Sequence, residues 1–410
     1  MDRIRNIVIT GLTVIVFGMG MNPVFARPKT SGDLPEGNNA FAVALYEQLR
    51  QNKSHEGENL FLSPFSVSTA FALAYAGARG ETAEQMEKVL HFPCRGKELN
   101  KAFAKLIDNL NARQKRGNYN LSVANALWGQ KGYDFRKAYL SLTQKYYNAG
   151  LKEVDFKNNT EPSRKRINKW VAQETQNKIK KLMPRGSIDR MTRLVLTNAI
   201  YFKARWAETF NESATRKEPF ILLDGTKVKN PMMHQTETFG YRELDDLKIL
   251  EMPYTKHELS MVVLLPKEDD GLPKLEESLT EKKLAKWLKR MGHPRVTVAM
   301  PKFKLETKFM LGDTLKKMGM VNAFQKGKAN FSGMNGRRDL YIQAAIHKAY
   351  VDVYEEGTEA AAATGIAVGA TAAHVAPPKK FIADHPFLFL IRDRKTNSIL
   401  FMGRLMDPTK

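Results

Sequence analysis

The sequence predicts a mixed α/β (α+β) protein in which helices come first and strands are concentrated later. Apolar residues recur at helical spacing in the first part of the 410-residue chain, and short apolar runs typical of strands dominate the later part. Hydrophobic residues make up 43% of the chain, which supports a large core. The length alone would suggest two or three domains, but we find no linker, charge block or internal repeat that marks a boundary.

The predicted helices begin near the N-terminus. Phe41, Leu45 and Leu49 lie at helical spacing in the first of them. Ser63-Pro64 is typical of a helix start, because proline is tolerated in the first turn. The helices that we expect are residues 39–50, a helix that starts at 63–64, and residues 99–114, 164–181 and 308–324.

The predicted strands lie mostly beyond residue 220. Leu223-Asp-Gly-Thr226 indicates a hairpin turn between two strand-like runs. The other strands that we expect are residues 259–265, 295–300, 340–354, 387–392 and 399–405.

Residues 1–26 have the pattern of a secretory signal peptide. A short basic start is followed by an apolar run over residues 7–19, and Val24-Phe25-Ala26 places small residues where signal peptidase cleaves. The alternative is a membrane anchor, but the run is short for one. We therefore expect a mature chain of residues 27–410 that is free of the membrane and secreted, either extracellular or, in a bacterium, periplasmic.

Cys94 is the only cysteine, so no disulfide can form within the chain. An intermolecular disulfide would require an exposed thiol. The stability of an exported chain of this kind must come from packing.

The formal charge of +22 predicts attraction to polyanions such as glycosaminoglycans. Ordinary solvated helix faces would produce similar clusters of cations. No basic motif interleaved with aromatic residues is visible, so we expect no specific binding to nucleic acid. The candidate clusters are residues 97–105, 113–116, 164–166, 178–181 and 282–290.

The segment that follows the predicted strand 340–354 is rich in alanine. Residues 355–364 read Glu-Glu-Gly-Thr-Glu-Ala-Ala-Ala-Ala-Thr, and residues 365–374 carry no formal charge. Four consecutive alanines favour a helix, whereas the glycines and small residues favour a flexible loop. A period of two is also present, and a strand entering the middle of a sheet needs one small or β-branched face of this kind. The residues on that face are Thr358, Ala360, Ala362, Thr364, Ile366, Val368 and Ala370.

Residues 355–364 resemble the hinge of the reactive loop of inhibitory serpins. Other blocks resemble serpin motifs in the serpin order, and the resemblance runs from about Asn38 to Pro408. Many independent blocks in one order make it specific. The blocks are residues 59–66, 196–203 with Trp206, 252–254, 262–266, 300–303, 347–349, 384–387 and 400–404.

The resemblance implies a serpin fold: a single domain over residues 27–410 with three β-sheets, about eight or nine surrounding helices and an exposed reactive loop at about 355–380. Serpins present this loop as bait. The target protease forms an acyl-enzyme, and the cut loop inserts into the large sheet before water hydrolyses the intermediate. In serpins the bait residue follows the hinge glycine by about fourteen positions, which gives Thr371-Ala372 as the reactive bond. The long stretch to Pro386 leaves Val368, Ala370 or Ala372 as alternative bait residues.

The resemblance also assigns three groups of site residues. Serpins have a hydrogen-bonded shutter cluster beneath the sheet opening, and a breach group where the loop enters the sheet. The hinge is Glu355, Glu356, Gly357, Thr358, Glu359, Ala360, Ala361, Ala362, Ala363 and Thr364. The shutter cluster is Ser63, Ser66, Asn198 and His347, and the breach group is Trp206, Lys302 and Glu355.

An inhibitor is the function that these residues favour. The chain has no nucleophile elbow, phosphate-binding glycine loop or metal-ligand spacing, so we expect no catalytic residue, metal or cofactor, apart from a polyanion. The small, uncharged residues 368–373 suit a serine protease with a shallow apolar pocket, of elastase or subtilisin type, and we expect the inhibitor to be a monomer. The alternatives are a non-inhibitory serpin that acts as a binding protein or chaperone, and an inhibitor of a cysteine protease.

Overall fold

A computed structural model describes residues 33–117, 119–358 and 377–410 of the chain. Its longer helices lie in the N-terminal half, and shorter ones follow in the C-terminal half. The helix α2 begins directly after Ser63, whose hydroxyl caps the first turn by accepting from the backbone N–H of Ser66. The α-helices within this part are α1 (Leu34–Arg50), α2 (Pro64–Gly77), α3 (Gly80–Val89), α4 (Gly96–Lys115), α5 (Lys137–Tyr147), α6 (Thr160–Glu174), α7 (Leu272–Ser278), α8 (Glu281–Leu288), α9 (Leu311–Lys317) and α10 (Ser332–Asn335).

The strands form three sheets, as the resemblance predicted. One six-stranded sheet has the order β1 (Leu60–Leu62), β16 (Ile399–Leu405), β15 (Phe387–Asp393), β9 (Leu259–Pro266), β8 (Leu247–Pro253) and β7 (Gly240–Glu243). The four-stranded sheet has the order β14 (Lys379–Ile382), β10 (Arg295–Pro301), β6 (Lys227–Thr238) and β5 (Arg216–Ile221). The other six-stranded sheet, called the large sheet below, has the order β11 (Phe303–Met310), β12 (Ala344–Tyr354), β13 (Gly357–Thr358), β4 (Leu194–Arg205), β2 (Asn120–Gln130) and β3 (Leu151–Val154).

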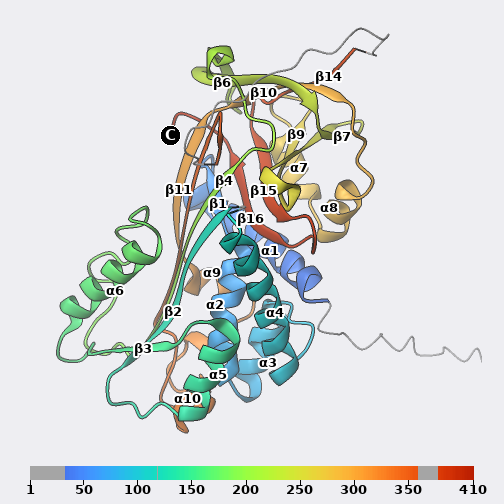
Figure 1. Cartoon of the computed structure of the whole chain (residues 1–410). Coiled ribbons are helices and arrows are strands. Elements are labelled where there is room, and N and C mark those ends of the chain that lie inside the picture. The colour runs from blue at the N-terminus through green and yellow to red at the C-terminus, as the bar shows by residue number, and fades with distance from the viewer. Residues whose placement is uncertain (1–32, 118, 359–376) are drawn as a thin grey trace, which may run out of the picture.

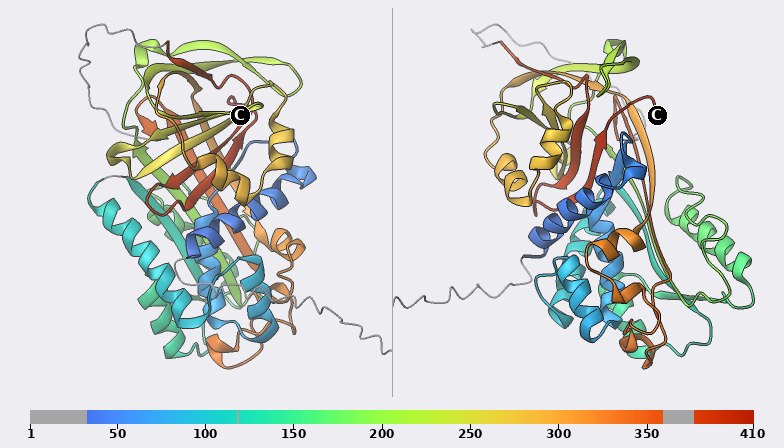
Figure 2. Two further views of the ribbon diagram at one scale, coloured as in Figure 1. Left: turned by 90° about the vertical axis from the view of Figure 1, so that its right-hand side faces the viewer. Right: turned by 180° about the vertical axis from the view of Figure 1, so that it is seen from behind.

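The large sheet separates two apolar cores. Its inner face joins α1, α2 and the other sheets in the main core. Its outer face is covered by α6 and the segment that follows it, which bury Trp128, Tyr201 and Tyr350. Figure 1 shows α6 on one side of this sheet and α2, α4 and α5 on the other, and the view from behind in Figure 2 shows the same division.

In the middle of the large sheet, the pairing of two neighbouring strands ends where a third strand lies between them. β4 and β12 run parallel and pair directly with each other from Ala344 opposite Val195 to Tyr350 opposite Tyr201. Above that point the short strand β13 lies between them and pairs with both. We call the end of direct pairing, at Tyr350 and Tyr201, the fork.

Most predicted strands are confirmed, but three predicted helices were wrong at their ends. The helix predicted over 39–50 begins earlier, at Leu34. The helix predicted over 164–181 ends at Glu174, because Gln176 and Asn177 both take left-handed φ angles (50° and 61°) that turn the chain. The helix predicted over 308–324 begins only at Leu311, after β11, and Gly319 with φ 109° follows its end.

Two side chains singled out from the sequence, Arg113 in a basic cluster and Cys94, are buried. Arg113, from the cluster 113–116, is buried and makes a bidentate ion pair with Asp393 at 2.8 Å, so it is not available to a polyanion. Cys94 is only 8% exposed, and burial raises the pKa of its thiol. None of the helices in the described ranges is both long and apolar enough to cross a membrane.

Candidate functional site

β13 occupies the upper end of the large sheet, antiparallel to both of its neighbours. A Cβ atom on Gly357 would lie 2.1 Å from the carbonyl oxygen of Ala204 and 2.7 Å from Cα of Arg205. The backbones can therefore approach this closely only at a glycine. Thr358, the one described member of the small-residue face, is fully buried.

An ion pair fixes the chain just before β13. Oε2 of Glu355 lies 2.7 Å from Nζ of Lys302, and Oε1 accepts a 2.7 Å hydrogen bond from the Thr215 hydroxyl. Burial alone would raise the pKa of Glu355, but the hydrogen bonds from Lys302 and Thr215 outweigh it and lower that pKa. Glu355 is therefore ionised at neutral pH, although its side chain is only 4% exposed.

A stacked aromatic pair holds the same end. The indole N–H of Trp206 donates to the carbonyl of Tyr354 at 3.0 Å, and its backbone N–H donates to the carbonyl of Glu356 at 2.9 Å. The Trp206 ring stacks on Tyr254 with ring centres 4.5 Å apart and planes 7° apart. The Tyr254 hydroxyl lies 2.8 Å from the Thr358 hydroxyl. The start of β13 is thus fastened by backbone, ring and hydroxyl contacts.

The four predicted shutter residues lie together beneath the middle of the large sheet. The amide nitrogen of Asn198 donates to the Ser66 hydroxyl at 2.6 Å and to Oδ1 of Asn125, and the Ser66 hydroxyl donates to the same Oδ1 at 3.2 Å. The Ser63 backbone N–H donates to Nε2 of His347 at 3.0 Å. Nδ1 of His347 contacts Oδ1 of Asn198, its direct partner across the strands.

These contacts define the tautomer of His347. Because Nε2 accepts a hydrogen bond from Ser63, the ring proton must sit on Nδ1 and point to Asn198. Desolvation lowers the pKa of His347 to about 3. The imidazole is therefore neutral at physiological pH, and every polar atom of the cluster that spans β4 and β12 is paired without a charge.

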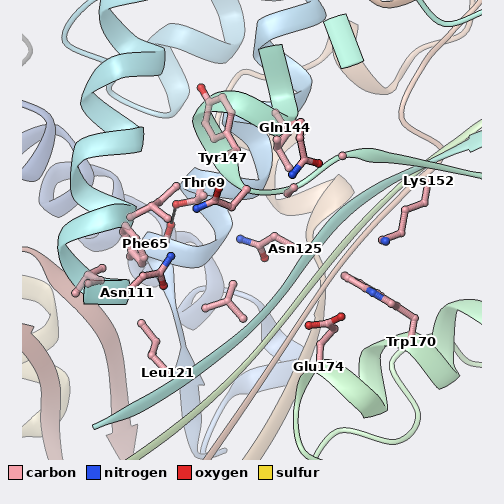
Figure 3. A pocket seen from close by; sticks show the side chains of 17 residues that line it. Phe65, Thr69, Asn111, Leu121, Asn125, Gln144, Tyr147, Lys152, Trp170 and Glu174 are labelled. Carbon is pink, nitrogen blue, oxygen red and sulfur yellow. Dashed lines mark hydrogen bonds between the residues drawn. The ribbon is translucent and has the colours of Figure 1, made fainter. Parts of the chain in front are cut away.

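Three residues of the site were not assigned to it from the sequence: Asn125, Tyr254 and Thr215. Asn125 had no local signal beyond being an amide within an apolar strand. It also lines a pocket of about 300 Å³ between α2, α4, α5 and the large sheet (Figure 3). In the same pocket Lys152 lies over the Trp170 ring at 5.2 Å. In the described ranges no group of three His, Cys, Asp or Glu side chains could hold a metal ion.

Several predicted residues lie outside the described residues. They are the hinge from Glu359 to Thr364, the reactive bond Thr371-Ala372 with its alternatives, and the signal peptide 1–26. Of the hinge residues that the structure describes, Glu355 and Glu356 form the turn after β12, and Gly357 and Thr358 return to the large sheet as β13 beside Trp206.

Comparison with known proteins decides the family. The sequence model described as "Serpin (serine protease inhibitor)" matches residues 36–408, nearly the whole chain. The chain belongs to the serpin family. Solved serpin structures match the fold as well, and one of them is Serpin48 of the insect Tenebrio molitor, with a TM-score of 0.81 and 34% identity. This match covers 92% of the present serpin and 98% of that chain.

Curated relatives match over the same length. The human protein named leukocyte elastase inhibitor is 44% identical over 385 residues, covering 92% of this serpin and 99% of the relative. Human Serpin B3 is 43% identical over 394 residues, again covering 92% and 99%. The family description and the name of the first relative support protease inhibition as the general activity of the family.

Proposed function

We propose that this serpin is a secreted, single-use inhibitor of serine proteases of the elastase or subtilisin type. The observation that carries the proposal is the position of β13, whose two residues already separate the upper ends of β4 and β12. A strand that starts between two parallel strands can be extended only by parting them further. The small, uncharged residues that follow Thr358 on its inward face are suited to that path.

The register of β13 defines what extension would require. Thr358 pairs with Val353 of β12 and with Ala204 of β4. These two residues are in the same register as the directly paired residues of β12 and β4 below the fork, such as His347 and Asn198. If the chain continued in this register, Thr364 would come between His347 and Asn198 and replace their direct contact. All seven residue pairs between β4 and β12 would then be replaced by pairs with the new strand. From Gly357 to Thr371 such a strand would span roughly 50 Å.

The chemical step belongs to the protease. Its serine Oγ attacks the carbonyl carbon of Thr371 and gives its proton to the protease's general base. That base then protonates the amine of Ala372 as the Thr371–Ala372 peptide bond breaks, and an acyl-enzyme remains. Insertion of the cut loop would carry the acyl-enzyme to the opposite end of the sheet before hydrolysis. Here the serpin supplies the bait, the path and the driving force, and one chain contains all three, so it acts as a monomer.

The driving force must come from the native sheet. Ordering the loop backbone costs about 1–2 kcal/mol per residue, whereas each new ladder hydrogen bond returns only about 0.5–1.5 kcal/mol. These contributions nearly cancel, so the uncleaved protein must be metastable. Cleavage within residues 368–373 is therefore expected to raise the melting temperature strongly, and no rise would contradict insertion.

The target class is proposed from the bait and from the relatives. Residues 368–373 read Val-Gly-Ala-Thr-Ala-Ala, and the first basic residue beyond them is Lys379. A shallow apolar pocket accepts such residues and a trypsin-like pocket does not. A 44% identical relative carries the name leukocyte elastase inhibitor, which supports the same class.

The decisive experiment mixes residues 27–410 with pancreatic elastase and, separately, with subtilisin. A band at the summed mass that survives denaturing electrophoresis would establish the acyl trap, and mass spectrometry of the released C-terminal peptide would identify the bond. A stable trypsin complex formed by cleavage at 368–373 would contradict the target class. Export is tested separately, by sequencing the secreted protein, which should begin at Arg27.

The main alternative is a non-inhibitory serpin that serves as a binding protein or chaperone. Cleavage without a covalent band and without a gain in melting temperature would favour it. A covalent complex with a cysteine protease would favour the other alternative, an inhibitor of cysteine proteases.

We also propose that a sulfated polysaccharide binds the exposed basic surface of α6 and the segment after it. Arg164 donates to the carbonyl of Met183 at 2.7 Å, which joins two of the predicted clusters into one surface. Lys165, Arg166, Lys180 and Lys181 are exposed there. Replacing these four with Met should lower the salt concentration that elutes the protein from immobilised heparin, whereas Lys282→Met/Lys283→Met on α8 should not. Equal retention on duplex DNA would indicate a non-specific polyanion surface instead.

A further inference from the structure

The fork is the point at which the large sheet would begin to open, and aromatic rings mark both of its sides. Tyr201 of β4 and Tyr350 of β12 are the last directly paired residues below β13. Their rings lie on the outer face with centres 5.9 Å apart, and their side chains are buried. Any downward extension of β13 must separate this pair first.

Lys178 lies across the fork. Its Nζ is 5.8 Å from the centre of the Tyr201 ring and 5.7 Å from that of Tyr350. A lysine ammonium within about 6 Å of an aromatic ring is attracted to it, and the attraction grows when water is excluded. Lys178 is half-buried, so a single cation contacts both strands that have to part.

The backbone holds Lys178 in this place. The left-handed residues Gln176 and Asn177 turn the chain back toward the sheet after α6. The backbone N–H of Lys178 donates to the carbonyl of Thr175 at 2.9 Å, and the Thr175 hydroxyl accepts from the N–H of Ile179 at 3.2 Å. Ile179 is fully buried in the core beneath α6, so the segment is anchored on both sides of the lysine.

Insertion of a strand would strain this bridge. One additional strand moves β4 and β12 about 4.8 Å further apart. The ring centres, now 5.9 Å apart, would then lie about 10.7 Å apart, and only positions within about 2.7 Å of the line between them would be within 6 Å of both. Nζ now lies about 4.9 Å from that line, so the anchored segment would have to move about 2 Å toward the sheet or the contacts would weaken or break. The contacts of Lys178 therefore favour the closed sheet over the open one.

We propose that Lys178 is a positioning residue that latches the fork and sets the rate at which the large sheet opens for loop insertion. This inference rests on the proposed inhibitory function for its physiological meaning. The latch itself is a property of the uncleaved protein. Because Lys178 points to the two rings, it does not belong to the exposed basic surface that includes its neighbours Lys180 and Lys181.

Lys304 provides a matched control. Its Nζ lies 5.3 Å from the Tyr350 ring centre, but no contact with Tyr201 accompanies it. Replacing Lys304 with Met removes a cation over the same ring without removing a bridge between the strands. If only the loss of a cation near Tyr350 matters, Lys178→Met and Lys304→Met should behave alike. If Lys178 bridges the strands, only Lys178→Met should loosen the fork.

The test measures amide hydrogen exchange by mass spectrometry on the uncleaved protein, in segments 195–202 and 344–351. Lys178→Met should speed exchange in both segments by about 2- to 10-fold, the range expected for losing half-buried cation–π contacts. Lys178→Arg, which keeps a cation able to stack, and Lys304→Met should stay within about twofold of the wild type. Unchanged or slower exchange in Lys178→Met, or equal acceleration in Lys304→Met, would overturn the latch.

The protease assay separates this inference from the proposed function. If the wild type traps elastase or subtilisin, Lys178→Met should insert its loop faster and leave a smaller fraction of cleaved, uncomplexed inhibitor. If the wild type traps no protease while Lys178→Met still accelerates exchange at the fork, the inhibitory function fails and the latch stands.

Discussion

The upper end and the middle of the large sheet are held closed in different ways. At the upper end, an ion pair and a stacked ring pair hold the chain: Glu355 pairs with the half-exposed Lys302, and Trp206 stacks on Tyr254. In the middle, a neutral hydrogen-bond network centred on Asn198 and His347 joins the strands, and its members are almost completely buried.

The difference suggests two roles: the upper end determines where the loop leaves the sheet, and the middle determines how strongly the strands are held together. An ion pair with one partner in solvent is screened and contributes little free energy, but it fixes where the loop leaves the sheet. A buried network becomes costly as soon as one member is removed, because the remaining polar groups lose their partners. We therefore expect the upper end to guide the loop and the middle to resist opening.

The largest effect should come from a charge at the upper end of the path. Thr358→Arg would force a guanidinium into a fully buried position that now holds a hydroxyl bonded to Tyr254. Insertion should slow, and the yield of denaturant-resistant protease complex should fall more than about tenfold while cleavage continues. Thr358→Ser, which keeps the hydroxyl, serves as the control. Full complex yield in Thr358→Arg would show that the loop does not use this path.

A large loss of stability is expected in the middle of the sheet. Asn198→Ala would remove the partner of His347, Ser66 and Asn125 at once, and should lower the free energy of unfolding by about 3 kcal/mol. Urea unfolding of the uncleaved protein measures it. A loss below about 1 kcal/mol would mean that water or rearranged side chains replace the network.

The pH dependence of the middle follows from His347, whose folded pKa of about 3 lies below the ordinary value of 6.5. The unfolded chain takes up a proton below pH 6.5 and the folded protein does not, so this stability is present above pH 6.5 and is lost as the pH falls toward 3. At pH 5 the loss should be about 2 kcal/mol. Measuring the free energy of unfolding of wild type and His347→Asn at pH 7.5 and 5 isolates the contribution of His347. An equal change with pH in both proteins would contradict a lowered pKa of His347.

The smallest effect is expected for the ion pair at the upper end. Glu355→Gln keeps an acceptor for Lys302 and Thr215 but removes the charge, and should cost about 0.5–1 kcal/mol. The cost should shrink further at high salt. If urea unfolding instead gave a loss equal to that of Asn198→Ala, the proposed contrast between the two regions would be wrong.

Much of the fold was predictable because strands and helices leave periodic signals. The strands β9, β10, β15 and β16 were predicted nearly to their ends. The helix over 164–181 was extended too far because Ile179 continues the apolar spacing of Ile167 and Val171, although the turn at Gln176 and Asn177 redirects the chain. The start of α9 was misplaced because Phe309 belongs to β11.

The site was predictable only through the resemblance to serpins. No local pattern links Ser63 to His347, which are brought together by the approach of α2 to β12. The bridge from Lys178 to Tyr201 and Tyr350 likewise joins three distant segments, and the sequence instead placed Lys178 in a basic cluster. Long-range contacts of this kind depend on the register of the sheet, which single residues do not reveal.

The fixed register of β13 has a consequence for the length of the loop. Because Gly357 and Thr358 are already paired, every later residue would have its side assigned by counting from them. Deleting or adding one residue between Thr358 and Thr364 would turn all following inward side chains outward and would place Gly365 or Ala363 against His347. The number of residues in the hinge is therefore as constrained as their size, and related chains should tolerate substitutions there far better than insertions or deletions.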